Sequence, residues 1–435
     1  MGIRGNSMKR RYKEQLWIAA AKKEGGNIFY PLDLWHRKGN VHDLTGQWQQ
    51  AEDIFRRNIS RAKEFRKKDM EAQSSNALGW VLHRQGQDEE AEALFIGSRD
   101  IYMASGDLMG LAKTYGFMGG VCYHQGRYAE ALELYGKQLE LSERSGDPAG
   151  TCVSYNNLGN VVGEQGDLNQ AYEYYEKALT IAEKIGDTLR QATIIGNIGV
   201  IYMTRGDYVS AEEWLLRQGR LSEKAGDKYS LAATYANLAG IYLLTGRFEP
   251  GLIQIEKKAE LSKEMGDMRG LAVALDYKAL VLKNRGDMTG AEDHYLRAIE
   301  IGRQCNMKYY LCGFLFNLAQ LYYELSRHDE ADRFNLLAGE MAAGIGESET
   351  LNDSRILGFR IASTTDPRGA SEGLRKMLEE KMEEHHRAEI LFWLCKLEGK
   401  IEDRIESLRL YRDLYERIPN YDYKDKIDRL EKDIP

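Results

Sequence analysis

The stretch YNNLGNVVGEQGDLNQAYEYYEKAL, which runs from Tyr155 to Leu179, contains the pattern that decides the fold. Its apolar and small residues recur at helical spacing, and a break at Gly166 separates two segments. The second segment places Tyr175 and Leu179 on one stripe, as expected of a helix that is buried along one face. The stretch therefore predicts two helices joined by a tight turn.

The same markers return every 40 residues along most of the chain. Between successive units a Gly-Asp pair, such as Gly106-Asp107, can end one helix in the left-handed conformation and cap the next helix. A small residue such as Gly159 follows a leucine in the first helix and allows the two helices to approach closely. The turn position within each unit is occupied by Gly46, Gly86, Gly126, Gly166, Gly206, Gly246, Gly286 and Ser326. This period is the signature of a stacked array of helical pairs.

With these markers the stretch resembles a tetratricopeptide repeat, whose pattern is N-L-G…Y…G-D-Y…A…Y…A-L. The period is longer than the usual one of about 34 residues. It is similar to the extended repeats of Pins/LGN-type polarity adaptors, kinesin light chains and bacterial regulatory arrays. The resemblance implies an all-α fold, an α-α superhelix of about eight regular and two degenerate helix-turn-helix repeats. It also implies that the first helix of each pair lines a concave face.

The markers divide the chain into four segments. We expect a basic N-terminal helix over residues 1–27, which acts as a cap or linker, and eight repeats over residues 28–347. Two degenerate repeats are expected over residues 348–419. A C-terminal capping helix is expected over residues 420–435, because the terminal units of a solenoid need a polar outer face.

Composition limits the classes of partner. The net charge is −7 and the chain beyond its basic N-terminus is acidic, which disfavours nucleic acid as a partner. No apolar run approaches the roughly 20 residues that a membrane span requires. The five cysteines form no CxxC pair, which indicates free thiols in a reducing compartment, and we expect a cytoplasmic protein. Cys152 and Cys312 replace the alanines of other repeats and are expected to pack as small residues.

Motifs for chemistry were sought along the whole chain. The sequence contains no GxxxxGK[ST] phosphate loop, no GxGxxG after a strand, no HExxH and no GxSxG. His385 and His386 are adjacent, so we expect them to point to different helix faces and to make a poor metal pair. We therefore predict that the chain is not an enzyme and has no cofactor and no metal site.

Asparagine returns at one place in the first helix of several repeats, although it is a weak helix former. A carboxamide offers donors and an acceptor, so such a row can grip the main chain of an extended ligand. In the resembled adaptors an Asn at this place holds the bound peptide. The same face is expected to be widened by the small residues Gly116, Gly120, Gly196, Ala236 and Gly240. The candidate groove residues are Trp80, Tyr123, Asn156, Asn157, Asn160, Asn197, Asn237, Tyr277, Asn317 and Gln320.

The sequence favours a non-catalytic protein–protein interaction scaffold or adaptor that binds a protein or extended peptide in its concave groove through an Asn ladder. One alternative is that each Asn bonds the adjacent repeat and fixes the stacking. A second alternative is a regulatory or sensor array of a larger bacterial signalling protein with a kinase, cyclase or ATPase. A third is an enzyme with an unrecognised site. Basic groove positions are few and scattered, unlike the carboxylate clamps of chaperone-binding tetratricopeptide domains.

Overall fold

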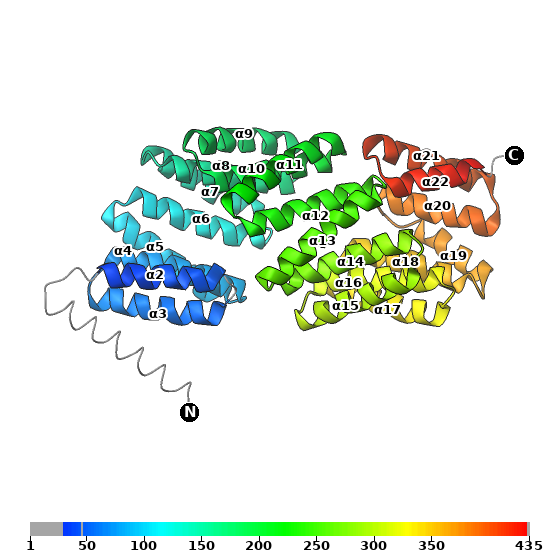
Figure 1. The fold of residues 1–435 in the computed structure, drawn as a ribbon, viewed down its shortest axis with the longest axis horizontal. Helices are drawn as coiled ribbons and strands as arrows, with labels where there is room; N and C mark the ends of the chain where they lie inside the picture. Colours follow the sequence, from blue (N-terminus) through cyan, green and yellow to red (C-terminus); the bar gives the residue numbers. More distant parts are fainter. Residues whose placement is uncertain (1–28, 45–46, 433–435) are drawn as a thin grey trace, which may run out of the picture. The chain divides into compact units, whose positions relative to one another are not determined.

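The computed structural model describes residues 29–44 and 47–432 (Figure 1). Within these ranges the chain forms 21 α-helices and no strand, and consecutive helices pack as antiparallel pairs. The prediction of an all-α helical solenoid is confirmed. The helix expected over residues 1–27 lies outside the described residues.

The described chain divides into two compact units. Unit 1 spans Met1–Asp187 and is described from residue 29. Its helices form four pairs, α2 to α9. Their bounds are α2 Phe29–Leu44, α3 Trp48–Glu64, α4 Lys68–Arg84, α5 Asp88–Ser105, α6 Leu108–His124, α7 Tyr128–Arg144, α8 Pro148–Glu164 and α9 Leu168–Lys184.

Unit 2 spans Thr188–Pro435 and continues the pairing with shorter helices towards its end. Its regular pairs are α10 Thr188–Thr204, α11 Tyr208–Ala225, α12 Lys228–Leu244, α13 Phe248–Met265, α14 Met268–Asn284, α15 Met288–Gln304, α16 Lys308–Glu324 and α17 His328–Ile345. The remaining helices are α18 Ser348–Ala362, α19 Pro367–Met377, α20 Glu384–Glu398, α21 Ile401–Arg417 and α22 Tyr421–Lys432.

The turns follow the expected chemistry. Gly106 has a φ of 70° and ends α5, and the Asp107 carboxylate accepts a hydrogen bond from the Gly110 backbone N–H at 3.0 Å. Asn306 and Ser326 adopt the same left-handed conformation, with φ of 50° and 58°. Asparagine is the residue that most often replaces glycine in this conformation, whereas serine adopts it at some cost in free energy.

Close approach of the two helices in a pair depends on the small residue of the first helix. A Cβ on Gly159 of α8 would lie 2.6 Å from Cε1 of Tyr175 of α9. Gly79 and Phe95 repeat the arrangement in α4 and α5, at 2.8 Å. The predicted reason for the recurring glycine is therefore confirmed: a large side chain of the second helix occupies the space above it.

A cysteine occupies a buried position between α8 and α9, the two helices of one pair. Cys152 is fully buried, and its Sγ lies 3.3 Å from the carbonyl oxygen of Ala178. Its predicted role as a small packing residue is confirmed.

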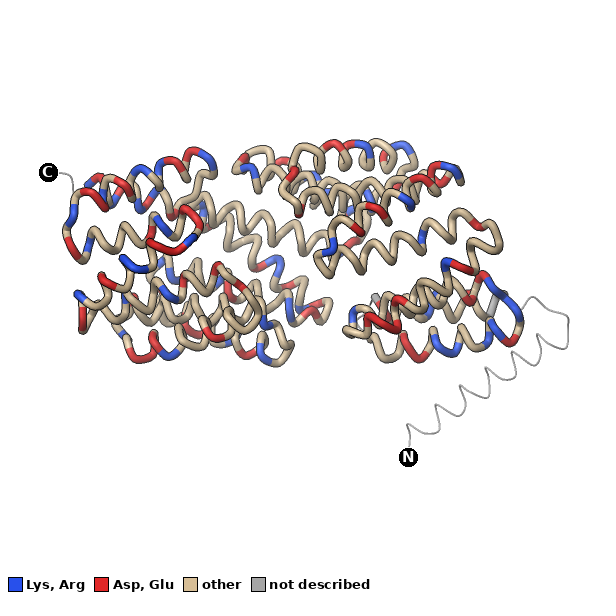
Figure 2. The backbone as a smooth tube through the Cα atoms, turned by 180° about the vertical axis from the view of Figure 1, so that it is seen from behind, with Lys and Arg blue, Asp and Glu red and all other residues tan. Residues whose placement is uncertain are grey.

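Charged residues of both signs are interleaved along the helices of both units (Figure 2). This is the pattern of solvated outer faces around thin apolar layers.

Gly159→Ala should lower the free energy of unfolding by about 1–3 kcal/mol, because the added methyl group overlaps the Tyr175 ring. Gly163→Ala is the matched control in the same helix, since its Cβ would meet only the Ala171 Cβ at an ordinary 3.6 Å. That variant should be neutral or should gain up to about 1 kcal/mol from helix propensity. Urea denaturation of both variants measures the difference, and equal effects would contradict the packing argument.

Candidate functional site

The structure places all ten candidate groove residues on first helices of their pairs. Those in unit 1 are Trp80 on α4, Tyr123 on α6, and Asn156, Asn157 and Asn160 on α8. Those in unit 2 are Asn197 on α10, Asn237 on α12, Tyr277 on α14, and Asn317 and Gln320 on α16. All ten side chains are partly exposed. Each unit therefore carries its own first-helix face, with amide and aromatic groups on it.

An aromatic and histidine cluster forms on α4 and α6 of unit 1. The Trp80 ring lies 5.9 Å from Phe117 and 5.4 Å from His124, between ring centroids. Nε2 of His83 lies 3.0 Å from Nδ1 of His124, and Nδ1 of His83 lies 2.7 Å from the Asp88 carboxylate. Burial lowers the pKa of His124, and the neighbouring His83 adds to this effect. The cluster joins two successive repeats.

The asparagines do not share one role. The Asn160 side-chain oxygen accepts a hydrogen bond from the Tyr175 hydroxyl at 2.7 Å, within one helical pair. Asn317 donates to both carboxylate oxygens of Asp276 on the preceding repeat, at 3.0 and 3.3 Å. Among the described residues, by contrast, the side chains of Asn157 and Asn237 have no hydrogen-bond partner.

Asp276 explains why Asn317 is tied to its neighbour. The Asp276 carboxyl group is 6% exposed, and burial raises its pKa to about 7, against the opposing hydrogen bond from Asn317. A buried carboxyl group without a donor is strongly destabilising. Asn317 therefore makes the contact that the stacking alternative predicts: its hydrogen bonds to Asp276 of the adjacent repeat link α14 to α16.

The expected widening of the face is wrong at three of its four glycines, Gly116, Gly120 and Gly196. A Cβ on Gly120 would lie 3.0 Å from Cζ3 of Trp80. A Cβ on Gly116 would lie 2.8 Å from Nε2 of Gln138, and Gly196 stands directly against Gln218 in the same way. Both glutamines are buried residues of the second helix. Gly116 and Gly196 therefore make room for an internal side chain. A Cβ on Gly240 would meet nothing within 4 Å, so among the four glycines only this position is open as expected.

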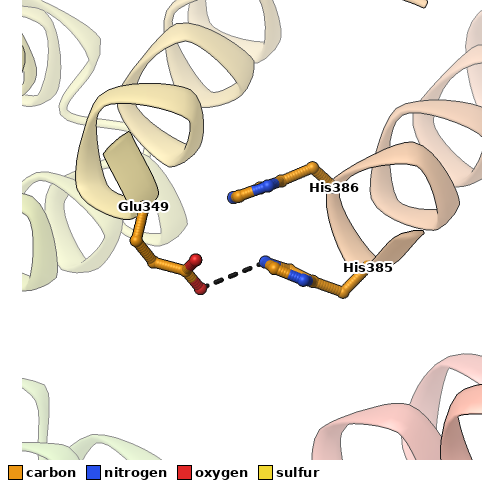
Figure 3. A group of neighbouring side chains, drawn as sticks. All are labelled: Glu349, His385 and His386. Carbon is orange, nitrogen blue, oxygen red and sulfur yellow. Dashed lines mark ion pairs between the residues drawn. The ribbon is translucent and has the colours of Figure 1, made fainter. Parts of the chain in front are cut away.

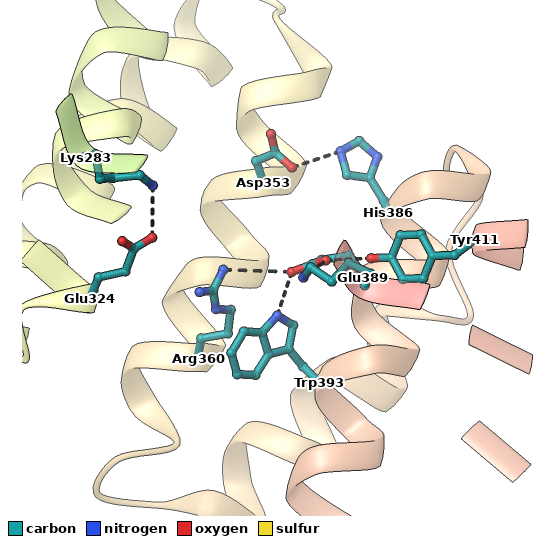
Figure 4. Close-up of polar contacts among 9 residues, drawn as sticks. Lys283, Glu324, Asp353, Arg360, His386, Glu389, Trp393 and Tyr411 are labelled. Carbon is teal, nitrogen blue, oxygen red and sulfur yellow. Dashed lines mark hydrogen bonds and ion pairs between the residues drawn. The ribbon is translucent and has the colours of Figure 1, made fainter. Parts of the chain in front are cut away.

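A polar network centred on Glu389 lies near the end of unit 2 (Figure 4). Its carboxylate accepts hydrogen bonds from Trp393 Nε1 at 2.6 Å, Tyr411 Oη at 2.7 Å and Lys426 Nζ at 2.5 Å. Arg360 lies 3.9 Å from it. Burial favours the neutral acid, but the charges of Lys426 and Arg360 lower the pKa of Glu389 to about 2. Nothing in the 40-residue pattern singled out this residue.

The adjacent histidines of α20 also differ from expectation. The rings of His385 and His386 both reach towards α18, with centroids 3.9 Å apart (Figure 3). The prediction that they point apart is wrong, because the imidazoles extend from the first turn of the helix and converge beyond their Cβ atoms. Glu349 lies 3.1 Å from His385 Nε2 and raises the pKa of that histidine.

The last helix of unit 2 returns to earlier repeats. Helix α22 contacts α12, and the Tyr421 ring packs edge-on against Phe248 at a centroid distance of 5.3 Å. The chain just before α22 lies against the turn at Gly206, where a Cβ would be 3.0 Å from the Arg417 carbonyl oxygen and 3.1 Å from Ile418 Cα. The C-terminal segment is therefore held by the turns of preceding pairs.

Gly206→Ala should loosen this contact, because the added methyl group presses on backbone atoms that cannot rotate away. Gly286→Ala is the matched control, since it has the same left-handed strain and nothing within 4 Å of its Cβ. Hydrogen exchange over residues 421–432 should be faster in Gly206→Ala than in Gly286→Ala. Equal exchange in the two variants would show that the Gly206 turn does not hold α22.

The geometry defines an α-solenoid of stacked helical pairs. Residues 30–104 and 110–184 match the family profile described as Tetratricopeptide repeat. This part of the chain is therefore built of tetratricopeptide repeats, as the sequence pattern predicted. Proteins of this class are protein–protein interaction scaffolds and are typically non-catalytic.

Solved structures show the same fold at low sequence identity. A Signal Transduction ATPase with Numerous Domains (STAND) protein with a tetratricopeptide repeat sensor from Pyrococcus horikoshii aligns with a TM-score of 0.53 and 14% identity, over 79% of this chain and 57% of that chain. The apo form of RapI aligns with a TM-score of 0.52 and 15% identity, over 64% and 99%. Aspartyl phosphate phosphatase F from Bacillus subtilis aligns with a TM-score of 0.52 and 14% identity, over 67% and 75%.

These identities establish the fold alone. The chain spans just over half the length of the STAND protein. No curated protein sequence matches it. Across the described residues, no helix combines the length and the apolar character that crossing a membrane demands.

Proposed function

We propose that the chain is a non-catalytic scaffold that binds an extended peptide segment of a partner protein on its first-helix faces. The proposal rests on the side-chain amides of Asn157 in unit 1 and Asn237 in unit 2, which are unpaired within the described part of the chain. Both amides are half-buried on a rigid helix, and neither has a hydrogen-bond partner among the described residues. Each offers a donor and an acceptor to a peptide group, at little cost in ordering.

The surroundings of Asn237 support peptide binding there. Gly240 lies three residues later on the same helix face, and its missing side chain leaves open space beside the amide. Leu243 and Leu244 follow and are partly exposed, which suits apolar side chains of a ligand. An extended peptide could therefore place its backbone against the amide and its side chains against the leucines.

The charges on these faces favour an internal peptide segment over a free C-terminus. Lys283 forms an ion pair with Glu324 at 2.9 Å, and Arg84 is paired with Asp43. Basic groups that are already neutralised are poor ligands for a terminal carboxylate. Recognition by neutral amides should depend only weakly on salt concentration.

Asn157→Ala/Asn237→Ala should weaken binding of peptides selected from a displayed random library by about tenfold or more, since each lost hydrogen bond contributes roughly 0.5–1.5 kcal/mol. The melting temperature should not change, because neither amide bonds another part of the chain. Fluorescence anisotropy with the selected peptides measures the affinity.

Asn160→Ala and Asn317→Ala are the matched controls at the same helix face. Both should lower the melting temperature, because Tyr175 and Asp276 lose their partners. Selection of no peptide from the library, or unchanged affinity of selected peptides for the double variant, would contradict the proposal. A drop in stability of the double variant comparable to that of the controls would instead favour the stacking role.

A second candidate is the sensor part of a larger signalling protein. The likeness to the STAND protein, whose tetratricopeptide repeats form a sensor, favours it at the level of fold. An antibody against this chain should then detect an endogenous polypeptide much larger than 49.6 kDa. A single endogenous band near that mass would remove this candidate.

A further inference from the structure

Two carboxylates and two imidazoles meet between α18 and α20 of unit 2. Glu349 and Asp353 lie one turn apart on α18. His385 and His386 occupy the first turn of α20 and face Glu349 (Figure 3). One ligand atom each from Glu349, His385 and His386 lies within 4.8 Å of the others. Asp353 adds a fourth group, with its Oδ1 3.3 Å from His386 Nε2 (Figure 4).

His386 is the residue that needs a partner here. Its side chain is 1% exposed, and among the described residues neither ring nitrogen makes a hydrogen bond of good geometry. Nε2 faces the Asp353 carboxylate at a distance, 3.3 Å, that is long for a charge-assisted hydrogen bond. Burial of an imidazole without a partner is unfavourable. A cation between His386 and the carboxylates would satisfy this nitrogen.

We propose that Glu349, Asp353, His385 and His386 bind a divalent transition-metal ion, of which Zn²⁺ fits best. Two imidazole nitrogens with carboxylate oxygens are a donor set that Zn²⁺ takes and that Ca²⁺ and Mg²⁺, which prefer oxygen alone, do not. Bonds of about 2.0–2.2 Å place tetrahedral ligand atoms about 3.4 Å apart. The separations of 3.1 Å for Glu349–His385 and 3.3 Å for Asp353–His386 already approach this value.

The carboxylate side chains can make the remaining adjustment of the ligand positions. The Glu349 side chain is 59% exposed and the Asp353 side chain 35% exposed, so both carboxylates can turn towards an ion that enters from solvent. The buried His386 has little freedom to move, so its ring nitrogen provides a ligand in a fixed position. The ion would bridge α18 and α20, the first helices of the last two pairs, where α19 has only 11 residues. The site lies on helices other than α8 and α12, which carry Asn157 and Asn237.

Tag-free full-length chain, treated with chelator and dialysed, should bind one Zn²⁺ per chain in isothermal titration calorimetry. Co²⁺ should give the visible absorption of a four-coordinate site, and Zn²⁺ should raise the melting temperature until chelator is added. His385→Gln and Glu349→Gln should each weaken Zn²⁺ binding by roughly tenfold or more, since even residues that only support ligands have effects of that size.

The control is His294→Gln, which removes a partly buried histidine of α15 whose ring nitrogen lies 2.8 Å from the Gly290 carbonyl oxygen. It should retain the affinity of the unaltered chain. Two variants are used because they differ in burial: if His385→Gln loses its helical circular dichroism, the exposed Glu349→Gln still decides the question. Absence of stoichiometric binding, or equal affinity in all three variants, would overturn the proposal.

Discussion

The contact between a glycine or alanine of one helix and a bulky side chain of the next is the constraint on which this structure depends. Gly159 beneath the Tyr175 ring represents it in unit 1, and Gly199 against Leu215 represents it in unit 2. A repeat array has no central core, so each pair must bury its own apolar layer and offer the remainder to its neighbour. Because the helices approach closely, this thin apolar layer is sufficient to hold each pair together.

The same constraint divides the polar residues of the first helices into two groups. Where a neighbouring side chain comes within reach, the amide serves the array, as Asn317 does for the buried Asp276 and Asn160 for Tyr175. Where no neighbour comes within reach, as for Asn157 and Asn237, the amide makes no hydrogen bond to the described chain and is the group that we propose binds a ligand. One row of asparagines therefore contains both stacking contacts and candidate binding groups, and the two hypotheses apply to different positions.

In the C-terminal part of unit 2, polar contacts are added to the apolar layers between helices. The 40-residue sequence markers are incomplete in its helices, and polar contacts help to stabilise the packing of these helices. Glu389 gathers Trp393, Tyr411 and Lys426, while the chain before α22 rests on the Gly206 turn. The two histidines beside Glu349 belong to this same region.

The sequence by itself determined the helices, their pairing and the solenoid, because helical spacing, left-handed turn residues such as Gly106 and caps such as Asp107 act within a few residues. It also identified the faces on which candidate groups lie. Only the tertiary structure decided that Gly196 accommodates Gln218, that Asn317 bonds Asp276 and that His385 and His386 converge on Glu349. These outcomes depend on side chains that arrive from another helix, in most cases from the neighbouring repeat, and no local pattern fixes the distance between them.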